Sequence, residues 1–122
     1  MPFNIEYDAA DDLIVATFLG PVTMALVKEY IAALLPLLEK TGCKRVLSDS
    51  RNGDLELSSI DIMQFPKMAG ASPLTSGLKR AVLKRPGTRG YEMYATMCNA
   101  QGQNVKLFES RAEAVEWLKS DG

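Results

Sequence analysis

The sequence of 122 residues contains no histidine. Its absence removes the commonest general base, the usual partner of a serine or cysteine nucleophile, and the commonest zinc ligand. Cysteine is scarce: Cys43 and Cys98 are far apart and form no Cys-x-x-Cys pattern. Neither a disulfide framework nor a thiolate zinc site is expected from such spacing, and both thiols are predicted to be reduced. We therefore expect no cofactor, no metal site and no familiar catalytic set.

Long apolar runs are also missing. The longest, residues 31–38, is interrupted by Pro36 and is too short to span a bilayer. The first eight residues lack the basic and then apolar layout of a signal peptide. We expect no transmembrane segment and a cytoplasmic location. The length, with 47% hydrophobic and 24% charged residues, fits one folded domain over residues 1–122.

Charge is distributed unevenly along the chain. Residues 1–61 carry five Lys or Arg against ten Asp or Glu, whereas residues 62–122 carry nine against five. No acid lies between Asp61 and Glu92, a window that holds Lys67, Lys79, Arg80, Lys84, Arg85 and Arg89. A net charge of −1 argues against nucleic-acid binding. A solvated or partner-facing positive surface is the favoured interpretation.

A narrower hypothesis concerns the turn at residues 87–90, Gly-Thr-Arg-Gly. Between a strand and a helix, backbone N–H groups of such a turn can meet a small anion. Thr88 and Arg89 are the candidate residues, although the pattern is not a Walker motif.

The periodicity of apolar residues and the positions of turn residues predict nine elements. Strands are expected over 3–7, 13–19, 44–49, 79–84 and 104–108. Helices are expected after Thr23, from 59 to 68, from 88 to 101, and after the capping box that joins Ser110 and Glu113. Pro36 should kink the first helix, and Pro66 should shorten or break the second. The order β-β-α-β-α-β-α-β-α predicts an α/β fold with a five-stranded, mixed, mostly parallel sheet covered by helices.

The stretch 44–60 is central because it contains a strand, a polar loop and the start of a helix. In α/β proteins, loops at the carboxyl ends of parallel strands commonly bind ligands or partners. Asp49, Asp54 and Glu56 could form a carboxylate cluster, but their spacing fits no calcium loop. Solvated turn residues are the favoured alternative. Ser58 or Ser59 can cap the following helix.

Four pieces of sequence, taken in order, resemble a known family: the Gly-Pro-Val-Thr turn at 20–23, VLSD at 46–49, RAVL at 80–83 and VKLFESRAEAVEWL at 105–118. Over nearly its full length the chain looks like the SpoIIAA-like proteins. Their fold is shared by STAS domains and, more distantly, by CRAL-TRIO-type lipid-transfer domains. The resemblance implies a binding or regulatory module rather than an enzyme.

The resemblance also implies a possible switch. In the anti-sigma-factor antagonists, a strand ends in Asp and an Asp-Ser-Ser-Gly follows about eight residues later, with a phosphorylated Ser at a helix N-terminus. Here Asp49 is followed at that spacing by Ser58 and Ser59, but the flanking Asp and Gly are absent. Nearby carboxylates would repel a phosphate, so a simple N-cap is the favoured interpretation of the serine pair.

Methionines and aromatic residues at helical spacing suggest a small apolar pocket that could take an apolar ligand or lipid. Its predicted lining is Met63, Phe65, Met68, Tyr91, Tyr94 and Met97. Such side chains are more often plain core or a dimer contact. The leading hypothesis is a non-enzymatic regulatory or ligand-binding module that acts as a homodimer or through a protein partner. The alternatives are a phosphorylatable switch at Ser58 or Ser59 and an enzyme that uses carboxylates such as Asp49.

Overall fold

The computed structural model describes residues 3–70, 77–100 and 102–120, with the side chains of 65–70 left outside the description. Its centre is a five-stranded sheet in which the spatial order of the strands equals their order in the chain. The strands are β1 (Phe3–Asp8), β2 (Leu13–Phe18), β3 (Arg45–Asp49), β4 (Lys79–Leu83) and β5 (Asn104–Phe108). β1 and β2 form an antiparallel hairpin, and the pairs β2–β3, β3–β4 and β4–β5 are parallel. The predicted fold class is confirmed.

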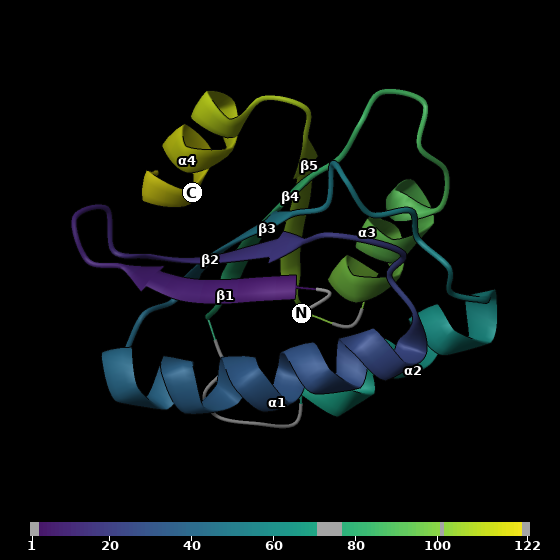
Figure 1. Ribbon diagram of the computed structural model, residues 1–122, viewed down its shortest axis with the longest axis horizontal. Helices are drawn as coiled ribbons and strands as arrows, with labels where there is room; N and C mark the ends of the chain where they lie inside the picture. Colours follow the sequence, from purple (N-terminus) through teal and green to yellow (C-terminus); the bar gives the residue numbers. More distant parts are fainter. Residues whose placement is uncertain (1–2, 71–76, 101, 121–122) are drawn as a thin grey trace.

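Three helices cover one face of the sheet and a fourth covers the other (Figure 1). The helices are α1 (Met24–Thr41), α2 (Ser59–Gly70), α3 (Tyr91–Ala100) and α4 (Arg111–Lys119). The first three each connect one parallel strand to its neighbour in the same spatial direction. Because such crossovers are almost always right-handed, α1, α2 and α3 are all placed on the same face. α4 follows the last strand and returns over the opposite face, where it contacts β3, β4 and β5.

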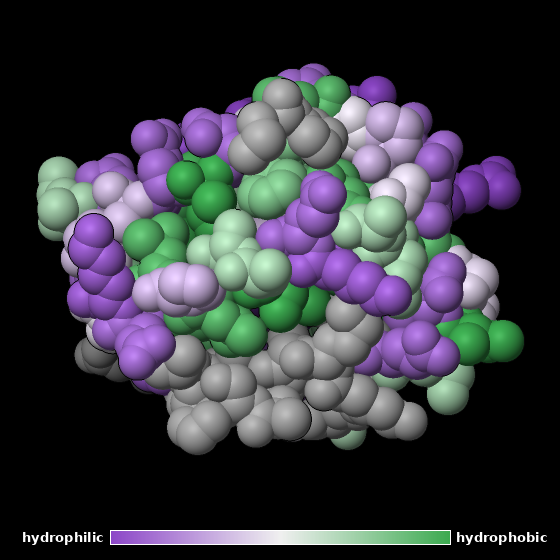
Figure 2. Space-filling view, turned by 60° about the horizontal axis from the view of Figure 1, so that its bottom comes forward, coloured by the Kyte–Doolittle hydropathy of each residue, from purple (hydrophilic) through white to green (hydrophobic). Residues whose placement is uncertain are grey.

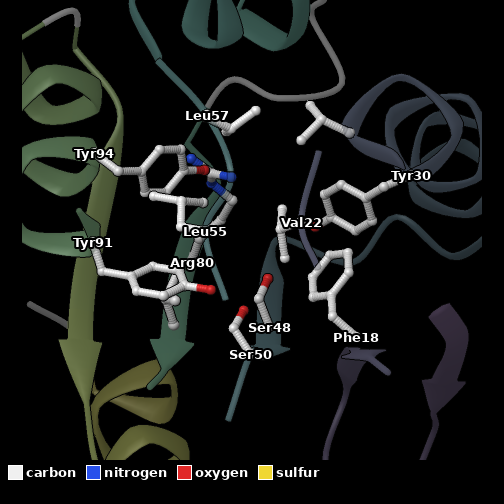
Figure 3. Close-up of a pocket in the computed structure, with 12 residues that line it drawn as sticks. Phe18, Val22, Tyr30, Ser48, Ser50, Leu55, Leu57, Arg80, Tyr91 and Tyr94 are labelled. Atoms are coloured by element: carbon white, nitrogen blue, oxygen red, sulfur yellow. The ribbon is translucent and has the colours of Figure 1, made fainter. Parts of the chain in front are cut away.

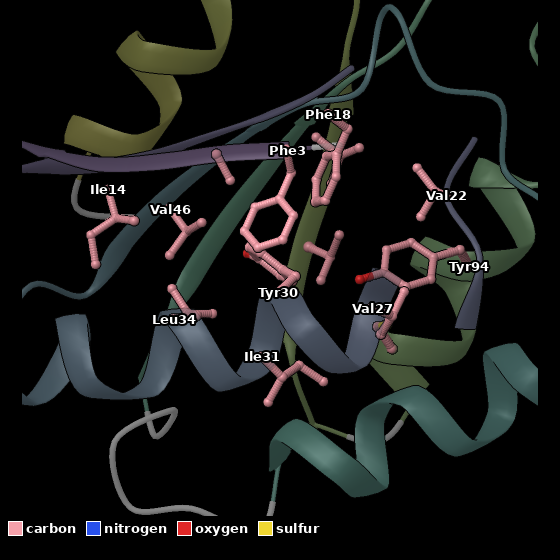
Figure 4. Close-up of a cluster of buried hydrophobic side chains, with 14 of the residues drawn as sticks. Phe3, Ile14, Phe18, Val22, Val27, Tyr30, Ile31, Leu34, Val46 and Tyr94 are labelled. Carbon is pink, nitrogen blue, oxygen red and sulfur yellow. The ribbon is translucent and has the colours of Figure 1, made fainter. Parts of the chain in front are cut away.

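Strand alternation divides the core into two parts. Ile14, Val46 and Val82 face the three-helix side, whereas Leu13 and Leu47 face α4. In the larger part, side chains from α1 interleave with side chains from the sheet (Figure 4). An aromatic group at its centre joins Phe3, Phe18 and Tyr30, with the last two ring centroids 5.3 Å apart at an edge-on angle. This group anchors the N-terminal half of α1 to the hairpin.

Local signals for the helix ends are confirmed. The Thr23 hydroxyl accepts a hydrogen bond from the backbone N–H of Leu26, and Gly42 ends α1 with a left-handed φ of 68°. The Ser110 hydroxyl accepts from the N–H of Glu113 at the start of α4. In the part of the chain that the structure describes, no helix combines the length and apolar character needed to cross a membrane.

Two boundaries differ from expectation, those of α2 and α3. α1 ends at Thr41 as predicted, with Pro36 inside it, whereas α2 continues through Pro66 for twelve residues. A proline removes one intrahelical hydrogen bond, and the neighbouring turns and the packing of each helix keep these helices continuous. α3 begins at Tyr91 rather than residue 88, because Gly87 and Gly90 adopt positive φ values and keep the intervening residues in a turn.

Candidate functional site

The segment after β3 is fastened to the end of β2 at the carboxyl edge of the sheet. The backbone N–H of Val22 donates to the carbonyl of Asp54 at 2.8 Å, and the N–H of Glu56 donates to the carbonyl of Val22 at 2.9 Å. Gly53 lies so close that a Cβ there would be 2.7 Å from the carbonyl oxygen of Gly20. These contacts hold residues 53–57 as a wall over the sheet.

Behind this wall lies a cavity of about 40 Å³. Phe18 and Tyr30 line one side, and Tyr91 and Tyr94 line the other (Figure 3). The remaining lining residues come from β3, β4, α1 and the segments beside them: Val22, Val27, Ser48, Ser50, Leu55, Leu57, Arg80 and Val82. The space is far smaller than the roughly 300 Å³ or more of common small-molecule pockets. It has room for a few atoms only.

Several polar groups point into this largely apolar space. The hydroxyls of Ser48, Ser50, Tyr91 and Tyr30 converge in Figure 3, and each of these residues is buried. Tyr91 Oη donates to the carbonyl of Gly53 at 2.8 Å. The hydroxyl of Tyr30 lies near Ser48 and Arg80. It nevertheless makes no hydrogen bond of acceptable distance and angle to any described residue, so it is a buried polar atom without a partner. A buried polar group without a partner is uncommon and costs stability.

A buried arginine lies beside these hydroxyls. Arg80, on β4, is only 5% exposed, and its guanidinium donates to Gln103 Oε1 at 2.8 Å. The guanidinium carbon also lies 5.6 Å from the centre of the Tyr94 ring. Burial disfavours the charged form, but the tyrosines and the thiol around it raise the pKa of Arg80 above its usual value. The group therefore carries its positive charge inside the protein.

Burial has the opposite effect on the phenols around this charge. Desolvation raises the pKa of Tyr30, Tyr91 and Tyr94 above the ordinary value for tyrosine. All three hydroxyls are neutral near pH 7 and can act as donors. The cavity is thus apolar in its walls and electropositive at one end.

Two carboxylates of the central loop are engaged with arginines. Asp49 receives a two-point contact from Arg51, with N–O distances of 2.9 and 2.8 Å. The Arg51 guanidinium holds the pKa of Asp49 below its usual value. Asp54 pairs with Arg85. Among the described residues, no group of three or more Cys, Asp or Glu side chains is arranged to hold a metal ion.

The serine pair lies at the exposed start of α2. The Ser58 hydroxyl accepts from the N–H of Asp61 at 3.1 Å, and the Asp61 carboxylate accepts from the N–H of Ser58 at 3.1 Å. This reciprocal contact is a capping box with Asp in the place of Glu. Ser58 therefore caps the helix, and Ser59 is the first helical residue. Phosphorylation of Ser58 or Ser59 stays a prediction.

The predicted apolar lining is divided by the structure. Tyr91 and Tyr94 line the cavity, whereas Met63 is 48% exposed on α2 and Met97 is half-buried against the larger core. The side chains of Phe65 and Met68 lie outside the described residues. The expectation of a pocket that includes all six residues stays a prediction.

The turn predicted to bind an anion borders an open hollow of about 490 Å³. Thr88 is half-buried and Arg89 is exposed there, together with the ion pair between Asp54 and Arg85. The carboxylate of Asp54 offsets part of the positive charge at this place, and anion binding by Thr88 and Arg89 stays a prediction.

Sequence reasoning did not single out Tyr30, Ser48, Ser50 or Arg80 as site residues. Tyr30 follows the apolar period of α1 and resembles an ordinary core position. A signal for Arg80 did exist: it is the second residue of a five-residue strand whose last three residues are apolar, and in a sheet covered on both faces its side chain must enter one covered face. The hydroxyls around it could not be assigned without the fold.

No protein-family model and no curated relative matches this sequence. Two solved structures resemble the whole chain. One is the anti-sigma factor antagonist SpoIIAA in its unphosphorylated form, with 10% identity, a TM-score of 0.59, and coverage of 97% of this chain and 98% of that chain. The other is an uncharacterised DUF3478-family protein with a SpoIIAA-like fold from Shewanella loihica, with 21% identity, a TM-score of 0.58, and coverage of 95% and 91%. The chain therefore has the SpoIIAA-like fold.

Proposed function

We propose that this protein is a non-enzymatic regulatory module that acts by binding a protein partner through the start of α2. The observation that supports the proposal is a pair of large apolar side chains on that helix. Ile60 is 66% exposed and Met63 is 48% exposed, and their spacing of three residues places them on the same helix surface. Ile62, between them, is buried in the core. Apolar residues on both the inner and the outer side of a short helix are typical of an interface.

The surroundings of this pair resemble the rim of an interface. We call Ile60 and Met63 the α2 patch. Exposed Ser58, Ser59 and Gln64 border it, and apolar surface is interrupted by polar side chains on the helical side of the molecule (Figure 2). An apolar centre with a polar rim is the usual layout of a transient protein interface.

The charges near the patch favour a different protein over a second copy. Glu56 and Asp61 carry negative charge beside it. A two-fold symmetric dimer through the α2 patch would bring these acids close to their own copies, which is unfavourable. A partner with a basic rim would pair with them. A homodimer through this surface is the competing outcome.

The test uses the double substitution Ile60→Ser and Met63→Ser. Fully burying a side chain of this size contributes roughly 1.5–3 kcal/mol. Because Ile60 and Met63 are already partly buried, we expect their replacement to weaken partner binding by about a hundredfold. Ala112→Ser, an exposed change on α4 at the opposite face, is the control.

The measurement has two stages. A partner captured from host cells by the natural chain is purified, and its affinity for each variant is measured by calorimetry. Equal affinity for the double variant would contradict the proposal. Sedimentation velocity provides the second check, since a dimer abolished by the double substitution would show that the patch binds another copy.

A second candidate function is a phosphorylatable switch at Ser58 or Ser59. Both serines are exposed at a helix N-terminus, where backbone N–H groups and the helix dipole favour a phosphate. A phosphate on Ser58 would lose the cap and face the Asp61 carboxylate, so Ser59 is the better acceptor. Intact-mass measurement after incubation with host extract and ATP tests it, with Ser59→Ala as the control. An unchanged mass, or a phosphate that persists in the variant with both serines replaced by alanine, would oppose this function.

A further inference from the structure

The cavity behind residues 53–57 has features of a ligand site that are independent of the α2 patch. Besides the hydroxyls of Ser50 and Tyr91, three polar side chains from three elements face it: Tyr30 from α1, Ser48 from β3 and Arg80 from β4. All three side chains are at least nine-tenths buried. Holding such groups out of water costs free energy unless each of them finds a partner.

The Tyr30 hydroxyl identifies the place where a partner is missing. It is buried, it points toward the centre of the cavity in Figure 3, and no described group satisfies it. The Ser48 hydroxyl is also directed into this space. Two hydroxyl donors and a guanidinium therefore surround a volume that is open to a few atoms. A ligand there must accept hydrogen bonds.

The charge of the site indicates the sign of the charge on its ligand. Arg80 supplies one positive charge, and none of the described lining residues is Asp or Glu. In a medium of low dielectric constant, a positive charge attracts an anion more strongly than it would in water. The neutral tyrosines around it add hydrogen-bond donors without adding negative charge.

The volume of the cavity and its single positive charge further limit the class of ligand. A cavity of about 40 Å³ can hold roughly three water-sized groups, since each needs about 10–15 Å³ in this measure. Phosphate is larger and carries between one and two negative charges near pH 7, which one guanidinium does not fully balance. A lipid chain does not fit this volume. A planar carboxylate with one or two carbons matches both limits, and its short carbon end would meet Phe18 and Val22.

We propose that this cavity binds a small carboxylate anion of the size of formate or acetate, with Arg80 as the counter-charge and Tyr30 and Ser48 as hydrogen-bond donors. Binding supplies the partner that the Tyr30 hydroxyl lacks. The site thus links the concentration of a small organic acid to the packing of α1 against β3 and β4. The proposal does not depend on the α2 patch, so either can fail alone.

The test titrates the full chain with sodium formate and sodium acetate, replacing sodium chloride at constant ionic strength. We expect saturable one-to-one binding by calorimetry and a melting temperature that rises with carboxylate concentration. Tyr30→Phe keeps the ring and removes the hydroxyl, and it should weaken binding by about tenfold or more. Ser48→Ala should weaken it in the same direction. Tyr7→Phe, which removes a tyrosine hydroxyl outside the cavity, should leave the affinity unchanged.

Three results would overturn the proposal. The first is the absence of saturable binding for both carboxylates. The second is equal affinity in the natural chain and in Tyr30→Phe, which would place the anion elsewhere. The third is equally tight binding of benzoate, because an aromatic acid exceeds the cavity and would show that the ligand lies outside it.

Discussion

Replacing Tyr30 by phenylalanine should make the protein more stable when no carboxylate is present. The substitution keeps the ring contacts with Phe3 and Phe18 and removes only a hydroxyl that is buried without a partner. An unsatisfied buried polar group costs about 1–3 kcal/mol. We expect the variant to gain about 1 kcal/mol or more in free energy of unfolding. For a domain of this size, each 1 kcal/mol raises the melting temperature by roughly 3–6 °C.

The assay is urea unfolding followed by circular dichroism in a chloride buffer free of carboxylates. The midpoint should rise without a change in the m-value. Tyr7→Phe is the control, because the Tyr7 hydroxyl donates to the Asp12 carboxylate at 2.8 Å on the surface, and its removal should not stabilise the protein. A loss of stability in Tyr30→Phe would refute the reasoning, since it would show that the hydroxyl already has a good partner.

Acetate should narrow the difference between the two proteins. The natural chain should gain stability with increasing acetate, whereas Tyr30→Phe should gain less over the same range. An equal gain in both would show that the hydroxyl takes no part in binding. The natural chain and Tyr30→Phe therefore test two claims together: that the Tyr30 hydroxyl lacks a hydrogen-bond partner, and that a bound carboxylate provides one.

Three further predictions concern the scaffold. Gly53→Ala should cost about 2 kcal/mol in urea unfolding, because its Cβ would meet a backbone oxygen at 2.7 Å; Gly20→Ala, with open space around it, should cost much less. Equal losses would oppose this close-approach argument. Ser110→Ala should lower stability by about 1 kcal/mol through loss of the α4 cap, and no loss would show that packing alone holds the first turn. Because the Arg51 guanidinium lowers the pKa of Asp49, their contact should stabilise the fold above the unfolded-state pKa near 3.8 and lose this effect as the pH falls through the lower folded value. Arg51→Gln should reduce that dependence on pH, and an unchanged acid transition would contradict it.

The order of elements could be predicted from sequence because its signals are local. Alternation in β1, the threonine cap of α1 and the capping box before α4 each depend on residues a few positions apart. The connections between strands then limit the arrangement, since short right-handed crossovers place neighbouring strands side by side. These rules were sufficient for the mixed sheet and its helical cover.

Local sequence patterns did not predict which side of α2 faces the core. Ile60, Ile62 and Met63 are all apolar, and no spacing rule for so short a helix says which side faces inward. In the fold, α2 contacts both α1 and α3, and this packing buries Ile62 and leaves the other two exposed. Tertiary contacts outweigh the weak preference of a single turn.

The sequence by itself determined the order of strands and helices, the caps of α1 and α4 and the mixed sheet, because these depend on contacts between near neighbours or on the handedness of a crossover. The SpoIIAA-like topology followed from the resemblance to that family. Only the tertiary structure decided that Tyr30, Ser48 and Arg80 meet in one buried space. These residues come from three elements separated by long stretches of chain, and each side chain alone could belong to an ordinary core. Their shared cavity exists because three packed layers leave a gap at the carboxyl edge of the sheet, and gaps of this kind depend on the volumes of every side chain around them.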